Sequence, residues 1–258
     1  MNAIRPIRQD EADDFLELLC GTFGLDVDRS SRFFYEEPFF DLKRKWALFE
    51  GRKMISILTV TPLTFGWGKA IGIAGVATRT DRREEGLASQ LLRHVLREAT
   101  RAGEGPALLF AVNTKVYEKV GFEAIDQVIR APIESLQGEE SAPTMLENSE
   151  VRAIYDRWAA AHPDRLRRDD LRWRYWKWHM RTCTPFRSGY VCAEPGLLRE
   201  AIFSPTIAPL PLMEGTEWLG TTRMADELGF MFSRATLEMT LMGYQFPSVP
   251  QLFLTDQF

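Results

Sequence analysis

The sequence predicts an α/β protein in which a mixed sheet flanked by helices is followed by a smaller α/β region. Three observations support this fold class. Apolar strand-like runs alternate with amphipathic helical segments through the first half of the chain. One run, residues 107–112, is apolar almost throughout, as in a strand covered on both faces of a sheet. After residue 150 the pattern changes to helices rich in arginine and tryptophan and to a hairpin.

The elements of the first half follow from apolar spacing and from glycine turns. Acidic residues at 10–13 predict the start of a helix, because carboxylates stabilise the positive end of the helix dipole. In the same helix, apolar residues between 15 and 23 recur at helical spacing. The other expected elements are strands at 4–7, 46–50, 54–62 and 70–78, a helix from 87 to 99, a strand at 107–112, a helical turn at 116–119 and a strand ending near 133.

Residues 134–149 are rich in Gly, Ser, Pro and Glu and predict a linker. The chain is therefore expected to divide into a domain at 1–133 and a second α+β domain at 150–258, which contributes to the acceptor side. The second hairpin echoes residues 46–60, so this domain can also be interpreted as a degenerate copy of the first. Its expected elements are helices at 151–161 and 169–182, strands at 188–194 and 199–203, and a terminal strand at 252–255.

Composition argues against several classes of function. A formal net charge of −4 over 258 residues gives no global reason to expect nucleic-acid binding. The apolar runs are too short to span a membrane, and the N-terminus lacks a signal-peptide pattern. Three scattered cysteines and three distant histidines predict neither a disulfide framework nor a metal site. We expect a cytoplasmic protein without a metal; the sequence leaves a homo-oligomer open.

The segment from Gly75 to Ala88 carries the most functional information. It runs from an expected strand, through a turn, into a long amphipathic helix, with Arg83-x-x-Gly86-x-Ala88 where the helix begins. Glycine lets a ligand approach the backbone closely, and the first N–H groups of a helix lack intrahelical partners. Such a helix start attracts phosphate through these donors and the helix dipole.

A second motif lies downstream, at residues 112–122. There the apolar strand is followed by Asn113, then Tyr117, then Gly121-Phe122. Together the two motifs resemble the GNAT superfamily of N-acetyltransferases, and the resemblance covers residues 3–133.

This resemblance implies acetyl-CoA as cosubstrate and direct transfer of an acetyl group to an amine. The strand would pair with the pantetheine arm, the loop would donate backbone N–H groups to the pyrophosphate, and the two residues after the buried strand would border a slot for the thioester. Tyr117 would protonate the leaving thiolate, a nearly balanced transfer for a free phenol. The implied cofactor residues are Val76, Ala77, Thr78, Arg83, Glu84, Glu85, Gly86, Leu87, Ala88, Ser89, Val112 and Asn113.

Glu84 and Glu85 depart from the pattern of the family, in which many loops carry basic residues or glycine at these positions. Two carboxylates beside a pyrophosphate oppose its binding unless their side chains turn to solvent. The alternative function is therefore a catalytically inactive GNAT-fold module that binds or senses an acyl-CoA.

A GNAT domain followed by an Arg/Trp-rich segment and a second α/β half also resembles the Eis (enhanced intracellular survival) type of N-acetyltransferase. Members of that group acetylate amines, including aminoglycosides, and use the carboxylate of the last residue as general base. The sequence ends in Phe258, which implies a catalytic role for that residue. The sterol-carrier-like C-terminal domain of the group is expected to be missing or much reduced.

Residues 26–41 follow the first helix, which in GNAT enzymes usually lines the acceptor cleft. Their mixture of aromatics and carboxylates suits a small cationic primary amine. Glu36 and Glu37 are predicted to contact the substrate or to act as the base, although aromatics in a core and acids on a solvated face would give the same pattern.

Residues 165–181 mix arginines with tryptophans, a combination that also occurs in nucleic-acid sites. The spacing of Leu171, Tyr175 and Trp178 favours a helix buried on a broad face with arginines at its rim. We therefore expect a small-molecule partner, with neither nucleic acid nor membrane.

Overall fold

The strands of the computed structural model join in one mixed sheet. The structure describes residues 2–133, 145–179, 181–204, 210, 212 and 214–258. The strands are β1 (Asn2–Pro6), β2 (Lys45–Glu50), β3 (Lys53–Phe65), β4 (Gly68–Thr78), β5 (Ala107–Ala111), β6 (Glu123–Pro132), β7 (Thr184–Phe186), β8 (Gly189–Glu194), β9 (Leu197–Ile202), β10 (Glu217–Thr221) and β11 (Thr236–Tyr244). Across the described residues their order is β1-β2-β3-β4-β5-β11-β6-β10-β9-β8-β7, and only the β4–β5 and β9–β10 pairs are parallel.

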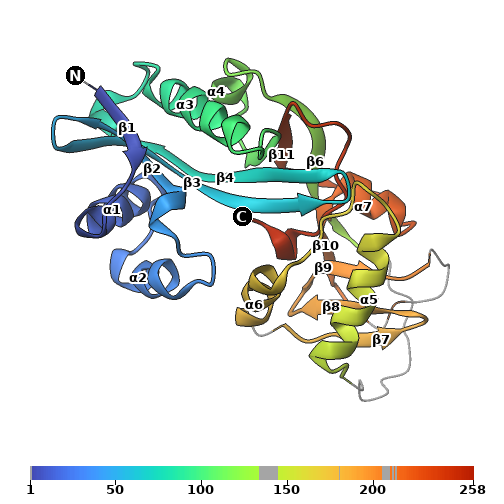
Figure 1. The fold of residues 1–258 in the computed structure, drawn as a ribbon. Coiled ribbons are helices and arrows are strands. Elements are labelled where there is room, and N and C mark those ends of the chain that lie inside the picture. The colour runs from blue at the N-terminus through green and yellow to red at the C-terminus, as the bar shows by residue number, and fades with distance from the viewer. Residues whose placement is uncertain (1, 134–144, 180, 205–209, 211, 213) are drawn as a thin grey trace.

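Helices cover both faces of the first half of this sheet. Figure 1 shows α3 and α4 on one face of the strands and α1 and α2 on the other. This arrangement confirms the predicted α/β fold class. The helices are α1 (Ala12–Phe23), α2 (Val27–Glu36), α3 (Leu87–Arg101), α4 (Lys115–Glu118), α5 (Asn148–Ala160), α6 (Asp170–Trp178) and α7 (Thr222–Glu227), with 3-10 helices η1 (Gln9–Glu11), η2 (Leu42–Arg44), η3 (Thr80–Arg82) and η4 (Leu254–Asp256).

In the first half of the chain, capping residues and a left-handed glycine mark where helices begin and end. α1 ends at Gly24, whose φ of 67° is the left-handed conformation common at helix C-termini. The predicted apolar face of α3 is confirmed, and it packs on β3 and β4. α2 was not predicted; Asp26 caps it by accepting from the Arg29 N–H. The buried residues of α3 are Leu87, Leu91, Leu92, Val95, Leu96 and Ala99.

The second half of the chain completes the sheet of the first half. β11 lies between β5 and β6, and β10 pairs with the other edge of β6. Each half carries two helices followed by three antiparallel strands, although common ancestry of the halves stays a prediction. The domain boundary at residue 133 also stays a prediction. Most of the predicted linker, residues 134–149, lies outside the described residues, and α5 already begins at Asn148.

Two expected secondary-structure elements of the second half were wrong. The predicted terminal strand at 252–255 is instead an extended segment leading into η4, with local bonds from Asp256 N–H to Phe253 and from Gln257 N–H to Leu254. The apolar run is buried against other elements, so it needs no sheet partner to leave water. The helix predicted at 169–182 ends at Trp178.

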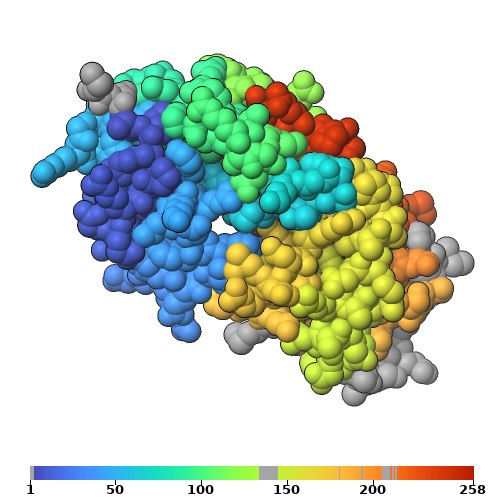
Figure 2. Space-filling view, in the orientation of Figure 1, coloured from blue at the N-terminus to red at the C-terminus, as the bar shows by residue number. Residues whose placement is uncertain are grey.

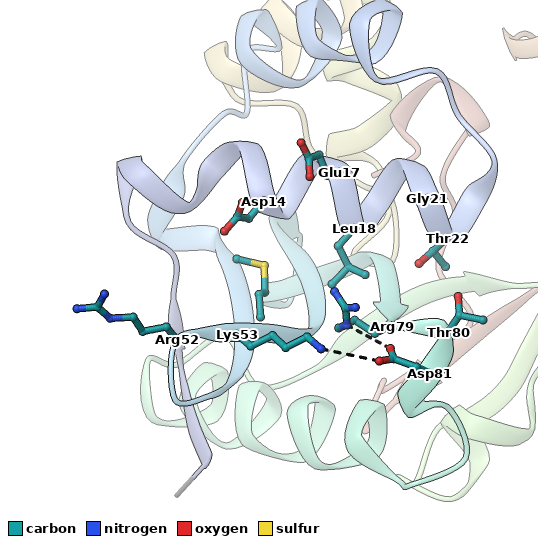
Figure 3. Close-up of a pocket in the computed structure, with 11 residues that line it drawn as sticks. Asp14, Glu17, Leu18, Gly21, Thr22, Arg52, Lys53, Arg79, Thr80 and Asp81 are labelled. Carbon is teal, nitrogen blue, oxygen red and sulfur yellow. Dashed lines mark hydrogen bonds and ion pairs between the residues drawn. The ribbon is translucent and has the colours of Figure 1, made fainter.

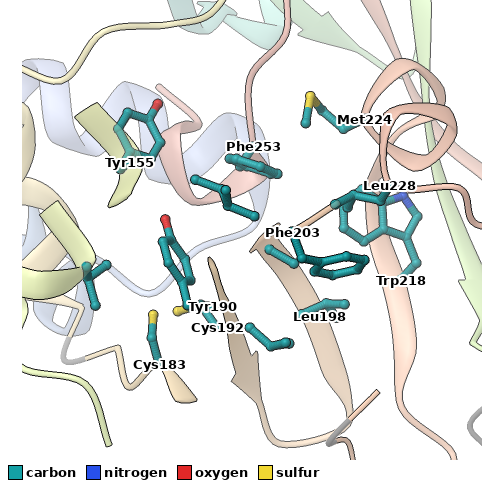
Figure 4. Packing of buried hydrophobic residues seen from close by; sticks show 14 of the residues in the cluster. Tyr155, Cys183, Tyr190, Cys192, Leu198, Phe203, Trp218, Met224, Leu228 and Phe253 are labelled. Carbon is teal, nitrogen blue, oxygen red and sulfur yellow. The ribbon is translucent and has the colours of Figure 1, made fainter. Parts of the chain in front are cut away.

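A large aromatic core holds the second half together. It packs α5, α6 and α7 against β8, β9 and β10, and Figure 4 shows part of it at close range. Trp173, Trp176 and Trp218 are each at most 2% exposed. Cys183 and Cys192 lie in the same core, and the described cysteines form no disulfide. Among the described residues, no helix has the length and apolar character needed to cross a membrane.

A buried charge network joins this core to the segment that carries η4. The Arg168 guanidinium donates to both carboxylate oxygens of Glu200, at 3.0 and 2.7 Å, and to Asp256 at 2.7 Å. All three side chains have no exposed surface. Tyr190 and Thr255 donate to Glu200 as well. Burial raises the pKa of Glu200, but the charge and hydrogen bonds of Arg168 outweigh burial and lower it.

A second arginine from the same stretch binds the next part of that segment. Arg172 donates to the backbone oxygen of Asp256 at 3.2 Å and to that of Pro62 on β3 at 2.8 Å. The Tyr175 hydroxyl donates to the backbone oxygen of Gln257 at 3.3 Å. The expectation of arginines at the rim of this helix was therefore wrong for Arg172, which is buried and donates to two backbone carbonyl groups.

We predict that Asp256→Asn lowers the free energy of unfolding by about 3 kcal/mol or more, because it leaves the buried Arg168 without one of its carboxylates. Asp170→Asn is the matched control. It removes an exposed aspartate from an arginine pair, with Arg152, and should change stability by less than about 1 kcal/mol. Chemical denaturation of both variants measures the difference. Equal losses would contradict a structural role for the network.

Candidate active site

The centre of the candidate site is a slot between β4 and β5. These parallel strands pair only at Ile71 with Ala107 and at Gly72 with Leu108, and then diverge. Among the described residues, no strand pairs with the facing edge of β4 from residue 73 to residue 78. Its backbone groups on that edge can therefore accept an extended ligand as an additional strand.

A bulge in β4 exposes different residues to the two faces of this slot. Ala74 faces Thr59 of β3 and Ala77 faces Ile57, so Gly75 and Val76 together oppose one residue. Gly75 has a φ of 60°, which is typical of a bulge of this kind. Gly75 and Ala74 line a pocket on the α1 face, whereas Val76 packs into the core under α3.

The loop that follows β4 presents free backbone donors. α3 begins after Gly86, whose φ of 76° is left-handed. The first intrahelical bond runs from the Gln90 N–H to the Gly86 oxygen, so the N–H groups of residues 87–89 have no acceptor within the helix. Glu84 also has a positive φ, 68°, and its side chain is exposed. This local geometry fits the predicted pyrophosphate loop.

One of the two unfavourable carboxylates is already neutralised by an arginine. Glu85 accepts two hydrogen bonds from Arg82, at 2.7 and 2.8 Å. Arg82 also binds Glu50 of β2 through two bonds of 2.6 and 2.8 Å. The hydrogen bonds from Arg82 lower the pKa of Glu85, so this carboxylate is ionised and directed toward its partner. The sequence analysis missed Arg82, and only the pairing with the distant β2 reveals its role.

The residues predicted after β5 lie at the mouth of the slot. Val112 is 85% exposed, which is unusual for a valine next to a buried strand. Asn113 is exposed, and its side-chain oxygen accepts from the N–H of Lys115, the first residue of α4. On α4, Tyr117 packs against the same core cluster as Val76 and lies 6.2 Å from the Phe122 ring. Burial raises the pKa of Tyr117 above that of a free phenol.

A pocket of about 410 Å³ opens on the opposite face of β4. Figure 2 shows that face of the molecule hollowed between the blue helices α1 and α2 and the yellow α6. Glu37 lines this pocket, whereas Glu36 lies on the surface and pairs with Arg32 at 3.0 Å. The aromatic side chains that line it are Phe33, Phe34, Phe39, Tyr175, Trp178 and Phe258.

Glu37 is paired with a buried lysine. The Lys45 ammonium lies 3.4 Å from the Glu37 carboxylate and 4.4 Å from the centre of the Phe34 ring. Burial raises the pKa of Glu37, and burial lowers the pKa of Lys45. In each group the charged form is therefore less favoured than in a free side chain. Groups that exchange protons commonly have pKa values shifted in this way.

Phe258 lies at the inner end of the pocket. Its ring covers Gly72 of β4 so closely that an added β-carbon there would come within 2.3 Å of it, and it packs 5.4 Å from the Phe110 ring. The Arg168 and Arg172 contacts hold the preceding residues. The structure thus brings Phe258 and Glu37 to one pocket; a catalytic role for Phe258 stays a prediction.

Tyr175, Trp178 and His179 were missed as site residues. Their signal in the sequence is an aromatic stripe, which predicts a core equally well. All three line the pocket from α6 and its end, across from α2. Because they are remote in sequence from Phe33, only the contact of α6 with α2 reveals the pocket: the Trp178 and Phe33 rings are 5.5 Å apart.

A larger cavity of about 720 Å³ lies elsewhere, between α1, the β2–β3 turn and η3. Three of its charged side chains pair with one another, and Figure 3 shows both Lys53 and Arg79 bonded to Asp81. Its lining includes neither the facing edge of β4 nor Tyr117, so we do not assign it to the site. No group of three or more potential metal ligands occurs among the described residues.

Comparison with known proteins identifies the first half of the chain. Residues 3–125 match the acetyltransferase (GNAT) domain family. These residues form a GNAT acetyltransferase domain. They include the slot, the loop before α3 and Tyr117, and the match classes this domain among acetyltransferases, whereas the pocket also takes Tyr175, Trp178 and Phe258 from outside the matched residues. A search of curated proteins found no match.

Solved structures share the fold of the GNAT domain and of the region that follows it. A GCN5-related N-acetyltransferase from Kribbella flavida is 17% identical, with a TM-score of 0.69 over 94% of this chain and 70% of that chain. One from Anabaena variabilis is 16% identical, with a TM-score of 0.68 over 94% and 72%. Eis1 from Mycobacterium abscessus is 14% identical, with a TM-score of 0.62 over 93% and 73%. This similarity is one of fold, and membership in the Eis type stays a prediction.

We predict that Gly72→Ala lowers the free energy of unfolding by about 1–3 kcal/mol, because the methyl group overlaps the Phe258 ring. In a Phe258→Ala background the same change should have almost no effect, so a double-mutant cycle by thermal unfolding isolates the contact. Gly21→Ala is the control. Gly21 lies within α1 with nothing near its β-carbon, and alanine there should stabilise by about 0.5–1 kcal/mol. Additive effects of Gly72→Ala and Phe258→Ala would rule the contact out.

Proposed function

We propose that the protein is an acetyl-CoA-dependent N-acetyltransferase that acetylates a primary amine of a small, cationic substrate by direct transfer. The observation that carries this proposal is that different residues border the β4–β5 slot on the two faces of the sheet. The loop before α3 and Tyr117 border it on one face, and the pocket with Glu37 borders it on the other. A thioester and an amine that approach from opposite faces would therefore meet at β4.

The residues on the first face fit the cosubstrate. Acetyl-CoA supplies an activated acetyl thioester when bound. The unpaired edge of β4 at Val76, Ala77 and Thr78 would hold the pantetheine arm. The free N–H groups of Leu87, Ala88 and Ser89 would bind the pyrophosphate, with Gly86 allowing close approach.

The other predicted cofactor residues would lie around the facing edge of β4. Arg83 and Glu84 are exposed beside the loop, and the carboxylate of Glu85 is bound by Arg82. The exposed Val112 and Asn113 would border the slot on the β5 side. A ligand over Val112 would remove its apolar surface from water.

Acetyl transfer requires that one proton leaves the amine and that one proton reaches the thiolate sulfur. Tyr117 is the proposed donor to the sulfur. Its raised pKa keeps the phenol protonated at neutral pH, which a donor requires. The same rise makes the proton harder to give up, so the transfer is less balanced than for a free tyrosine.

Glu37 is the proposed acceptor of the proton from the amine, directly or through water. Its raised pKa makes it a stronger base than an exposed glutamate. Its carboxylate would also pair with the ammonium group of the substrate, which would replace Lys45 as its partner. Phe258 would position the substrate against β4, and Glu36, which does not line the pocket, would at most act at its rim.

We predict that Tyr117→Phe lowers kcat about 100-fold, because the leaving thiolate loses its proton donor, while the dissociation constant for acetyl-CoA is unchanged. Stopped assays of thiol release and isothermal titration measure the two quantities. Absence of acetyl-CoA binding would overturn the proposed function. Binding without turnover of any amine would instead indicate an acyl-CoA-binding module.

A pH profile checks the role of Tyr117 in a second way. Because burial raises the pKa of its phenol, loss of wild-type activity through its deprotonation should occur only above pH 10. The rate should rise with pH below that value as more amine becomes neutral. An alkaline loss centred well below pH 10 and absent from Tyr117→Phe would contradict the raised pKa.

A further inference from the structure

The chemistry of the pocket narrows the class of acceptor. Aromatic side chains reach the pocket from both sides. Phe33 lies 5.5 Å from Trp178, edge to face, and Phe39 lies 5.2 Å from Tyr175. These pairs span from α2 and the segment after it to α6. The pocket is therefore walled by ring faces and edges, which favour a flat apolar ligand.

Part of this aromatic wall stays exposed although its rings contact one another. The Phe33 side chain is 55% exposed although it lies at the pocket, and Trp178 beside it is only half-buried. An aromatic ring bound against this pair would take that surface out of water. Ligand binding would therefore bury apolar surface of Phe33 that the protein itself leaves in contact with water.

Negative charge in the pocket is scarce. Among the described side chains that line it, Glu37 is the acidic one, and Lys45 already pairs with it at 3.4 Å. Arg172 lies beneath Phe39, 4.9 Å from the ring centre, and adds positive charge nearby. A ligand with several ammonium groups would leave most of them without a carboxylate, which is costly in an apolar pocket.

We propose that the acceptor is a monoamine with a flat aromatic body, and not a polyamine or an aminoglycoside. The aromatic body packs against the wall that the Phe33–Trp178 and Phe39–Tyr175 pairs form, and the single amino group lies toward Glu37 and β4. This inference rests on the proposed function, since it names the substrate class of the same site. It departs from the aminoglycoside acceptors implied by the Eis resemblance.

The test compares amines that differ in aromatic body and in number of charges. 2-Phenylethylamine and tryptamine are compared with propylamine, spermidine and kanamycin, using kcat/KM with acetyl-CoA. The aromatic monoamines should exceed each of the others by roughly 10-fold or more, which corresponds to one well-placed ring contact plus its buried area. A higher kcat/KM for spermidine or kanamycin would overturn the inference.

A matched pair of variants tests the aromatic wall itself. Phe33→Ala should raise KM for 2-phenylethylamine roughly 10-fold and leave KM for propylamine unchanged. Phe23→Ala is the control, because Phe23 is 53% exposed at the end of α1 but does not line the pocket. Both side chains are exposed, so neither change should unfold the protein. Equal effects of the two variants, or an equal loss with propylamine, would contradict the proposed stacking.

Equilibrium binding separates this inference from the proposed function. Tryptophan fluorescence, which includes Trp178 at the pocket, is titrated with 2-phenylethylamine and with spermidine in the presence of CoA. Tighter binding of 2-phenylethylamine without turnover of any amine would support the inference and overturn the proposed function. Tighter binding of spermidine would overturn the inference even if acetylation occurs. Absence of binding by every amine would overturn the inference as well.

Discussion

The buried contact of Arg168 with Glu200 and Asp256 is the interaction on which the arrangement of the site depends. It joins the start of α6 to β9 and to the segment before Phe258. Charges without exposed surface are tolerated only when each is paired and hydrogen-bonded, as they are here. Because a displaced carboxylate would leave a charge unpaired, the network strongly specifies where this segment lies. The position of Phe258 against β4 follows from it.

The second constraint is the divergence of β4 and β5 beside a bulge. A regular parallel pair would satisfy the backbone edge of β4 and would leave no room for a ligand. Residues two apart share a face in a regular strand, but with Gly75 in a left-handed conformation Ala74 reaches the aromatic pocket and Val76 reaches the core under α3. The two faces thereby meet at one strand, a geometry suited to a reaction between two ligands that enter from opposite directions.

Sequence reasoning worked where chemistry is local. The helix start at Gly86 and the Tyr117 segment were located from short contiguous motifs, and the structure places the slot between them. It was wrong where burial against distant parts of the chain decides the conformation or the exposure of a residue. Residues 252–255 have the composition of a strand but form an extended segment and a 3-10 turn, and Arg172 has the charge of a surface residue but is 2% exposed. Local hydrogen bonds and burial against other elements hold residues 252–255, whereas backbone carbonyl groups far away in the chain accept from Arg172.

The sequence by itself determined the fold class and was enough to propose a cosubstrate side, because strand, loop and helix follow one another between residues 70 and 122 and their proposed roles depend on neighbouring backbone. Only the tertiary structure decided the acceptor side. That pocket combines Phe33 and Glu37 with Trp178 and Phe258, and residues so distant in the chain meet only because α6 packs against α2 and the Arg168 network holds the final segment. Tertiary structure also separated Glu37 from Glu36, since adjacent residues at a helix end point in different directions.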